Sequence, residues 1–241
     1  MRAAHRESMR GMRTMAIAGG LLASALALTG CGLASIGGPT EQDTASYQVT
    51  DKVTKLRLES SAGDTVLTET GGNAIRVTET LRWRGDGKPT PEHKVEGEEL
   101  FVAYDCPSNF GSCRVDYKIE IPKGLAVDLE AGSGNFTLRD LTGTIDVKLG
   151  SGDVDAAGLG GKKLYADAGS GDIELKYRRA PEEARLETGS GNTKLVVPAG
   201  KYAVATEVGS GDVNVKVDND GSSPNKISIS AGSGDVSVEP G

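Results

Sequence analysis

The chain has 241 residues, of which 37% are hydrophobic and 25% are charged, and its net charge is −7 at pH 7. This acidic balance disfavours nucleic acid and anionic lipid surfaces as binding partners. Beyond residue 31 the chain has two cysteines and one histidine, fewer than the four ligands of a structural zinc site.

Residues 1–30 have the pattern of a secretory signal peptide. Four arginines precede a short apolar run over residues 15–29, namely Arg2, Arg6, Arg10 and Arg13. The run is too short and wrongly flanked for a stable transmembrane helix. Because this segment holds four Arg and one Glu, its removal would take the net charge from −7 to −10.

The signal ends in Leu28-Thr29-Gly30-Cys31, which resembles a bacterial lipobox. The resemblance implies that Cys31 becomes N-terminal after cleavage and carries diacylglycerol, with acyl chains such as palmitate. The alternative is an ordinary signal peptide followed by an unrelated cysteine. We predict attachment to the extracytoplasmic face of the bacterial cell membrane through the lipid on Cys31. Residues 31–46, rich in Gly, Ser, Thr and Ala, predict a flexible tether.

Residues 47–122 alternate apolar and polar residues, which is typical of strands, but their repeat is blurred. The alternation is clearest over 53–58 and 75–81. We predict a β-rich N-terminal cap over 47–122, because terminal repeats of a stacked array are usually atypical.

Cys106 and Cys113 flank a turn-rich segment between two alternating runs. In an exported protein this pattern predicts a hairpin loop closed by a disulfide. A redox pair would favour a Cys-x-x-Cys spacing, which is absent here.

Residues 123–241 contain six copies of Gly-Ser-Gly followed by Asp or Asn, spaced 18 to 23 residues apart. Each copy lies between two short alternating runs. A unit of this size cannot bury its own apolar face, whereas stacked units pair their backbones ~4.8 Å apart. We therefore predict an all-β fold, a β-solenoid of repeats of about 20 residues. The alternative is an antiparallel meander or sandwich in which Gly-Ser-Gly forms hairpin turns.

Stacking would align the last residue of each phrase in a ladder of Asn135, Asp153, Asp172, Asn192, Asp212 and Asp235. Carboxylates ~5 Å apart repel by about 0.8 kcal/mol in water. We expect each side chain to accept hydrogen bonds from the backbone of its own corner, as in an Asx turn. Calcium is the alternative, but the spacing differs from that of the calcium-binding nonapeptide repeat. We predict a structural ladder, with no metal and no cofactor.

The run Tyr117-Lys118-Ile119-Glu120-Ile121-Pro122, followed by the repeated phrases and Val-x-Val strands, resembles the putative-adhesin β-strand-repeat family of bacterial envelope proteins. The resemblance covers residues 47–241 and implies a β-solenoid-like fold outside the cytoplasm. It brings no catalytic residues with it.

Two functions remain open. The first is a non-catalytic, lipid-anchored cell-envelope protein that acts as a surface binding, adhesin-like or scaffold module, with an envelope protein or a glycan as its partner. The second is a glycan-acting β-helix enzyme, which would need carboxylates paired across a cleft. A pocket with two or three converging carboxylates would favour the enzyme. The serines recur in every phrase, so none is a distinctive nucleophile.

The last copy of the phrase is followed closely by Gly241, without a recognisable cap. An uncovered solenoid end presents unpaired backbone groups that invite strand addition. We therefore expect the segment 236–238 to be an exposed edge strand, through which the chain associates with itself or with a partner.

Overall fold

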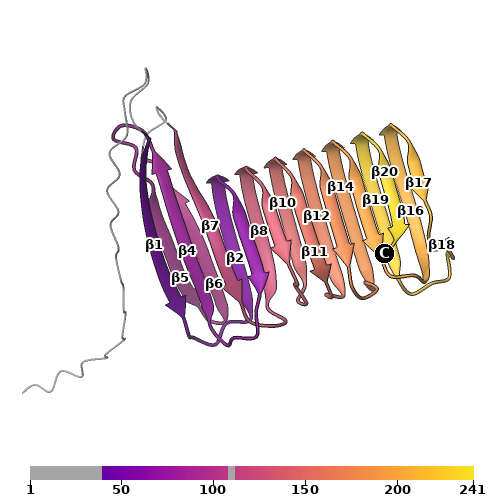
Figure 1. Cartoon of the computed structure of the whole chain (residues 1–241), viewed down its shortest axis with the longest axis horizontal. Coiled ribbons are helices and arrows are strands. Elements are labelled where there is room, and N and C mark those ends of the chain that lie inside the picture. Colours follow the sequence, from indigo (N-terminus) through magenta and orange to yellow (C-terminus); the bar gives the residue numbers. More distant parts are fainter. Residues whose placement is uncertain (1–39, 108–111) are drawn as a thin grey trace, which may run out of the picture.

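The computed structural model describes residues 40–107 and 112–241, so the predicted signal peptide, Cys31 and most of the predicted tether lie outside the described residues. The described chain is an elongated stack of two ten-stranded sheets (Figure 1). Within these ranges, no helix is long and apolar enough to cross a membrane.

We call the two sheets A and B. In spatial order, sheet A consists of β1 (Glu41–Val49), β4 (Ile75–Trp83), β7 (Cys113–Ile121), β3 (Thr65–Glu69), β9 (Phe136–Arg139), β11 (Val154–Leu159), β13 (Ile173–Tyr177), β15 (Thr193–Val197), β20 (Val236–Pro240) and β17 (Val213–Val215). Sheet B consists of β18 (Asp218–Asn219), β16 (Lys201–Ser210), β19 (Lys226–Ser233), β14 (Glu183–Ser190), β12 (Lys163–Ser170), β10 (Ile145–Ser151), β8 (Ala126–Ser133), β2 (Lys55–Ala62), β6 (Glu99–Asp105) and β5 (Thr90–Glu96).

Each repeat forms one coil, with a strand in sheet B, a Gly-Ser-Gly corner and a strand in sheet A. Neighbouring coils pair in parallel and in register, so that Val147 lies opposite Leu129 on one side and Ala166 on the other. This pairing confirms the predicted β-solenoid and excludes the antiparallel meander. The alternation places one apolar face of each strand between the sheets, where all three of these side chains are fully buried.

The corners require glycine because the backbones of successive coils touch there. Gly152 has φ 130°, in the region that L-residues with side chains rarely adopt. A Cβ atom at this position would collide with the carbonyl oxygen of Gly134 in the preceding coil. The repetition of the phrase therefore reflects stacking geometry.

The predicted boundary near residue 122 is not a structural break. The coil formed by β2 and β3 pairs directly with β8 and β9, and Leu58 lies opposite Leu129. Its corner is Ser61-Ala62-Gly63-Asp64, in which Gly63 has φ 120°. Among the described strands, antiparallel pairing is confined to the pairs β1–β4, β4–β7 and β5–β6 at the end of the stack. The solenoid thus begins within the segment predicted as a cap.

Two further expectations about this segment are wrong. Residues 41–46, expected in the tether, belong to β1, where Ala45 lies opposite Glu79 of β4. Their polar composition suits an edge strand, which buries little side-chain surface. Cys106 and Cys113 do not close a hairpin, because β6 belongs to sheet B and β7 to sheet A. The disulfide therefore spans a corner between the sheets.

The C-terminal strand is not at an edge, contrary to expectation. The last coil, β19 and β20, lies between β14–β15 and β16–β17, and Val236 pairs with Thr193 on one side and Val213 on the other. The longer spacing before the sixth phrase accommodates the loop that returns the chain into the stack. Figure 1 shows β16, β17 and β18 beyond it, at the end opposite β1.

Candidate functional site

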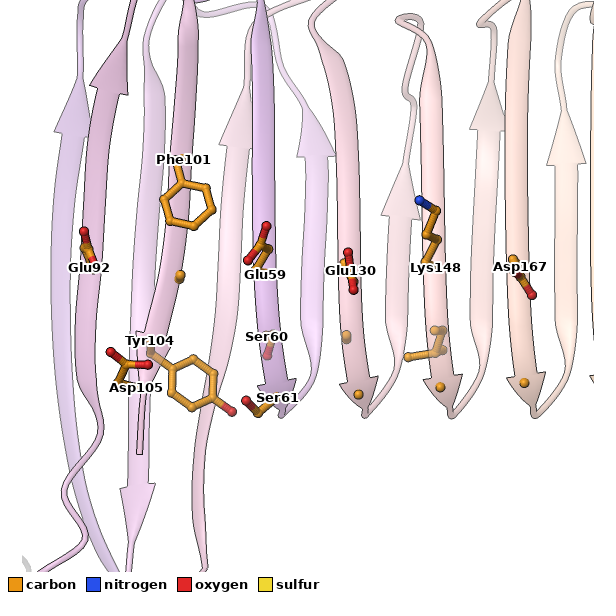
Figure 2. Close-up of a pocket in the computed structure, with 16 residues that line it drawn as sticks. Glu59, Ser60, Ser61, Glu92, Phe101, Tyr104, Asp105, Glu130, Lys148 and Asp167 are labelled. Carbon is orange, nitrogen blue, oxygen red and sulfur yellow. The ribbon is translucent and has the colours of Figure 1, made fainter. Parts of the chain in front are cut away.

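A concavity of about 770 Å³ lies on the outer face of sheet B (Figure 2). Every residue that lines it belongs to a strand, and the strands are β5, β6, β2, β8, β10 and β12. Five of these residues are carboxylates, namely Glu59, Glu92, Asp105, Glu130 and Asp167. We call this surface the sheet B groove.

Strand register creates the acidic floor of the groove. Glu59 lies opposite Glu130, and Glu130 lies opposite Lys148, which in turn lies opposite Asp167. All four point outward because they alternate with buried core residues, at strand spacings of ~4.8 Å. Like charges that face each other across strands repel, and Glu59 and Glu130 form such a pair. A cation bound between them would relieve this repulsion.

The opposite side of the groove comes from the hairpin of β5 and β6 at the end of sheet B. Glu92 and Asp105 lie on this side, and Figure 2 shows the rings of Phe101 and Tyr104 between them and Glu59. Tyr104 is buried, with 5% of its surface exposed, so the aromatic surface between these carboxylates is that of the half-buried Phe101. This combination suits a ligand with positive charge and some apolar surface.

Two hydrogen bonds of Tyr104 fix the position of β6 beside β2. Its hydroxyl donates to the carbonyl oxygen of Ala62 at 2.6 Å and accepts from the backbone N–H of Ala62 at 2.7 Å. Both bonds connect β6 to the end of β2, next to the corner. The Lys94 Nζ atom lies over the ring of Phe101, 5.3 Å from its centroid.

The acidic groups of the groove differ in their neighbours. Arg57 Nε donates to Glu59 Oε1 at 2.8 Å, so the charge of Glu59 is partly compensated. Glu92, Glu130 and Asp167 form no ion pair within the described residues. The groove therefore keeps carboxylates that remain available to a ligand.

The structure brings the predicted ladder together along the corners, but its hydrogen bonds differ from the expected ones. In five of the six ladder residues, all except Asp212, the side-chain Oδ1 accepts from the backbone N–H of the equivalent residue in the next coil, not from its own corner. Asn135 Oδ1 accepts from Asp153, Asp153 from Asp172, Asp172 from Asn192, Asn192 from Asp235, and Asp235 from Asp212, at 2.6–3.0 Å. These bonds offset the repulsion between carboxylates.

The sequence did not identify Asp64 as a ladder residue. Its Oδ1 accepts from the backbone N–H of Asn135 at 2.8 Å, and its own N–H donates to Asp116 Oδ1 at 3.1 Å. The degenerate phrase that ends at Asp64 is the signal that could have found it. Across residues 40–107 and 112–241, no cluster of three or more His, Cys, Asp or Glu side chains is placed to hold a metal ion. Cys106 and Cys113 are joined by a disulfide, and Cys31 lies outside the described residues.

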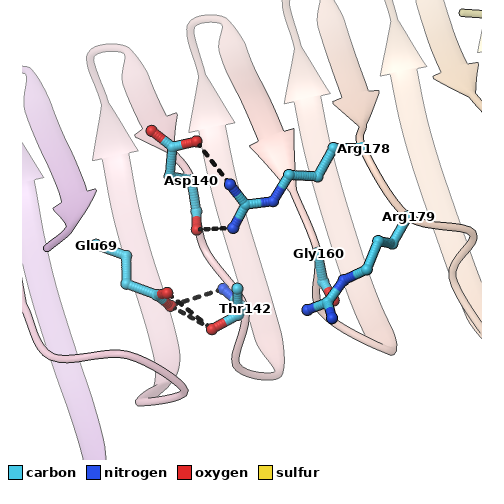
Figure 3. Close-up of polar contacts among 6 residues, drawn as sticks. All are labelled: Glu69, Asp140, Thr142, Gly160, Arg178 and Arg179. Atoms are coloured by element: carbon cyan, nitrogen blue, oxygen red, sulfur yellow. Dashed lines mark hydrogen bonds and ion pairs between the residues drawn. The ribbon is translucent and has the colours of Figure 1, made fainter. Parts of the chain in front are cut away.

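A second polar cluster lies at the opposite ends of the coils and braces the turns (Figure 3). The buried Glu69 accepts from the backbone N–H of Thr142 at 2.8 Å and from its hydroxyl at 2.6 Å. Arg178 Nη1 donates to Asp140 Oδ1 at 3.2 Å, and Arg179 Nη2 donates to the Gly160 carbonyl at 3.2 Å. The bonds of Glu69 and Arg179 tie turns of successive coils together, and the bond between Arg178 and Asp140 reaches across one intervening coil.

A buried acid that sequence reasoning missed lies in the N-terminal core. Glu79 is 3% exposed, and the Tyr47 hydroxyl donates to its Oε1 at 3.1 Å. Burial raises the pKa of Glu79 to about 7, despite this hydrogen bond. The Tyr47 ring stacks on His93, with centroids 3.9 Å apart, and thereby bridges the outermost strands of the two sheets. The sequence feature that could have identified Glu79 is its inward position in the alternating run 75–83.

The fold and its surface define a parallel two-sheet β-solenoid with an acidic groove on one face. The chain belongs to the Toastrack DUF4097 family, whose model matches residues 109–239. Among curated proteins, none matches this sequence.

Several solved crystal structures are similar to the structure of this chain, among them the following two. A "putative cell adhesion protein" from Clostridium sporogenes is 15% identical, with a TM-score of 0.53 over 84% of this chain and 100% of that chain. A "putative adhesin" from Bacteroides fragilis is 15% identical, with a TM-score of 0.43 over 83% of this chain and 97% of that chain. At this identity, the similarity to the Clostridium sporogenes protein shows a shared fold.

Proposed function

We propose that this protein is a non-catalytic, lipid-anchored module of the bacterial cell envelope, and that the sheet B groove binds an extended, positively charged ligand. The single observation that carries the binding function is the row of outward carboxylates beside the half-buried ring of Phe101. The Leu28-Thr29-Gly30-Cys31 sequence supports the anchor, and the names of the similar crystal structures are consistent with a surface location.

The form of the groove favours binding over catalysis. Its lining residues all belong to strands of one sheet, so the groove is a shallow feature of a sheet face. A glycosidic bond cleaved by a carboxylate pair benefits from walls that exclude water and hold the sugar between the two groups. An open face instead suits a long ligand that crosses several strands.

The charge and spacing of the groove indicate the chemistry of the ligand. Cationic groups spaced along an extended chain could each meet a carboxylate of the row formed by Glu59, Glu130 and Asp167. Lys148 interrupts this row, so the ligand must tolerate one positive charge within it. Amino-sugar polymers and lysine-rich segments both have this character, and exposed charges make such binding sensitive to salt.

The test is a calorimetric titration of the exported chain with a glucosamine oligomer and, separately, with an oligolysine. Glu59→Gln with Glu130→Gln removes two charges from the groove, and we expect affinity to fall about tenfold or more. Glu120→Gln with Glu174→Gln removes the same charge from the outer face of sheet A and serves as the matched control. Equal affinity of the two double variants would contradict binding in the groove.

A glycan-acting enzyme remains the second candidate, because Glu59 and Glu92 lie on opposite sides of the aromatic rings (Figure 2). Retaining and inverting glycosidases both use two carboxyl groups that flank the bond. Incubation of the exported chain with envelope glycans should release no reducing ends. Release that Glu59→Gln and Glu92→Gln each abolish would overturn the non-catalytic proposal.

A further inference from the structure

The coil of β16 and β17 forms an unpartnered end of the solenoid. In the described chain, β17 pairs only with β20. On its outer side, β16 pairs with β18 only at Lys201 and Tyr202. The backbone from Ala205 to Val215 therefore presents an open edge, at the end of the molecule opposite β1 (Figure 1).

The corners of the inner coils show which hydrogen bonds this edge is built to make. In the neighbouring coil, formed by β19 and β20, the Gly234 N–H donates to the carbonyl of Ser210 at 2.8 Å, and the Val236 N–H donates to the carbonyl of Asp212 at 2.9 Å. The Asp235 Oδ1 accepts the N–H of Asp212 at 2.9 Å. The same three groups recur one coil further on, as the N–H of Gly211, the N–H of Val213 and Oδ1 of Asp212. No described residue lies beyond them.

Apolar side chains are exposed beside these groups. Val213 is 47% exposed, whereas its equivalents Val154, Ile173 and Val236 are at most 1% exposed. Val208 and Val215 pack against the core from one side and remain partly exposed. A strand added at this end would therefore bury apolar surface as well as pair its backbone.

The two ends of the solenoid differ in how their edges are protected. At the β1 end, β5 has the sequence TPEHKVE, whose charges and Pro91 discourage strand addition, and Tyr47 stacks on His93 across the end. At the β16 end, the Asn219 side chain accepts from the N–H of Val204 at 3.0 Å and donates to its carbonyl at 3.3 Å. This protection covers only the beginning of β16, and the rest of the edge is left open.

We propose that this edge is a strand-addition site for an extended polypeptide segment of a partner protein, running parallel to β16 and β17. The segment would carry apolar residues at alternate positions and small residues at the corner, as the inner coils do. Only a polypeptide backbone supplies the alternating donors and acceptors that this edge lacks. The site is separate from the groove, and it lies at the end of the solenoid away from β1, the first described strand.

The probe is a labelled peptide with the sequence of residues 226–240, KISISAGSGDVSVEP, which already forms such a coil in the protein. In the stack, the Asp235 N–H donates to Asn192 Oδ1 at 3.0 Å, and the Gly191 N–H donates to the Ser233 carbonyl at 2.9 Å. Added to the open edge, the peptide would make the same bonds to Asp212 and Gly211. We expect saturable binding to the full exported chain, measured by fluorescence anisotropy.

Asp212→Ala removes the acceptor and Val213→Pro removes an N–H donor, and each should weaken peptide binding about tenfold or more. Asp153→Ala makes the same change as Asp212→Ala at an inner corner and should leave peptide affinity unchanged. The groove variant Glu59→Gln with Glu130→Gln should also bind the peptide normally, so this test is independent of the proposed function. Circular dichroism melting shows whether each variant is folded.

Two results would overturn the proposal. One is no binding to the wild-type chain at millimolar peptide, or binding that both edge variants retain. The other is a concentration-dependent dimer in analytical ultracentrifugation that Val213→Pro abolishes and the peptide does not compete with. That result would make a second copy of the chain the occupant of the edge.

Discussion

Glu79 should make the stability of the protein fall as the pH rises. Burial raises the pKa of this carboxyl from 4.5 to about 7 in the folded protein, so the folded chain holds the proton more tightly than the unfolded chain does. The contribution of Glu79 to the free energy of unfolding is therefore greatest below about pH 4.5, and it is lost as the pH rises through 7. The full shift corresponds to about 3 kcal/mol.

Glu79→Gln keeps a neutral group that can still hydrogen-bond to the Tyr47 hydroxyl and removes the titration. Between pH 5 and pH 8.5, we expect the wild-type free energy of unfolding to drop by about 2.5 kcal/mol more than that of the variant. Urea unfolding at a series of pH values measures this difference directly. Burial lowers the pKa of His93, which acts in the opposite direction below about pH 6.5, but this contribution is common to both proteins.

The exposed Glu130 provides the matched control, since Glu130→Gln changes the same functional group outside the core. Its stability should follow the wild-type pH dependence. The reasoning is refuted if Glu79→Gln shows the same slope as the wild-type protein. It is also refuted if the variant is the less stable protein at pH 8.5, because the buried charge would then be stabilising.

The remaining predictions concern the anchor, the disulfide and the ladder. Cys31→Ser should move the protein from the membrane fraction to a soluble fraction, and retention on the membrane after an alkaline carbonate wash would contradict lipidation. Cys106 and Cys113 should react with thiol probes only after reduction, and because their sequence separation is 7, loss of the bond should cost only about 2 kcal/mol. Asp172→Ala, which removes the acceptor of the Asn192 N–H, should cost about 1 kcal/mol in urea unfolding, whereas Asp172→Asn should be nearly neutral. Millimolar calcium should leave the melting temperature unchanged, and a rise of several degrees would indicate a metal site.

The repeated fold could be predicted from the sequence because each corner imposes a local requirement. Glycine is needed where coils touch, as at Gly152, and apolar residues such as Val147 are needed on the inner face. These requirements recur in every coil, so they are visible as a repeat. The ladder residues could be predicted in the same way, but the donors of their hydrogen bonds could not. An Asx turn and a bond to the next coil both require Asp or Asn at this position.

The order of coils in space could not be predicted, because no local sequence feature determines it. The last coil carries the same phrase as the others, and its insertion beside Thr193 and Val213 depends on the path of the loop before it. The groove was missed for a similar reason. Glu59, Glu92 and Glu130 lie far apart in the sequence. They reach one surface only because β2 pairs with both β8 and β6, and because β6 forms a hairpin with β5.

Carbodiimide labelling of carboxylates, read by mass spectrometry with and without intact cell envelopes, tests most directly whether the sheet B groove is the binding surface. If the groove is occupied by an envelope ligand, labelling of Glu59, Glu92 and Glu130 should fall when envelopes are present. Labelling of Glu120 and Glu174 on the outer face of sheet A should stay the same. Protection confined to sheet A, or no protection at all, would contradict binding in the groove.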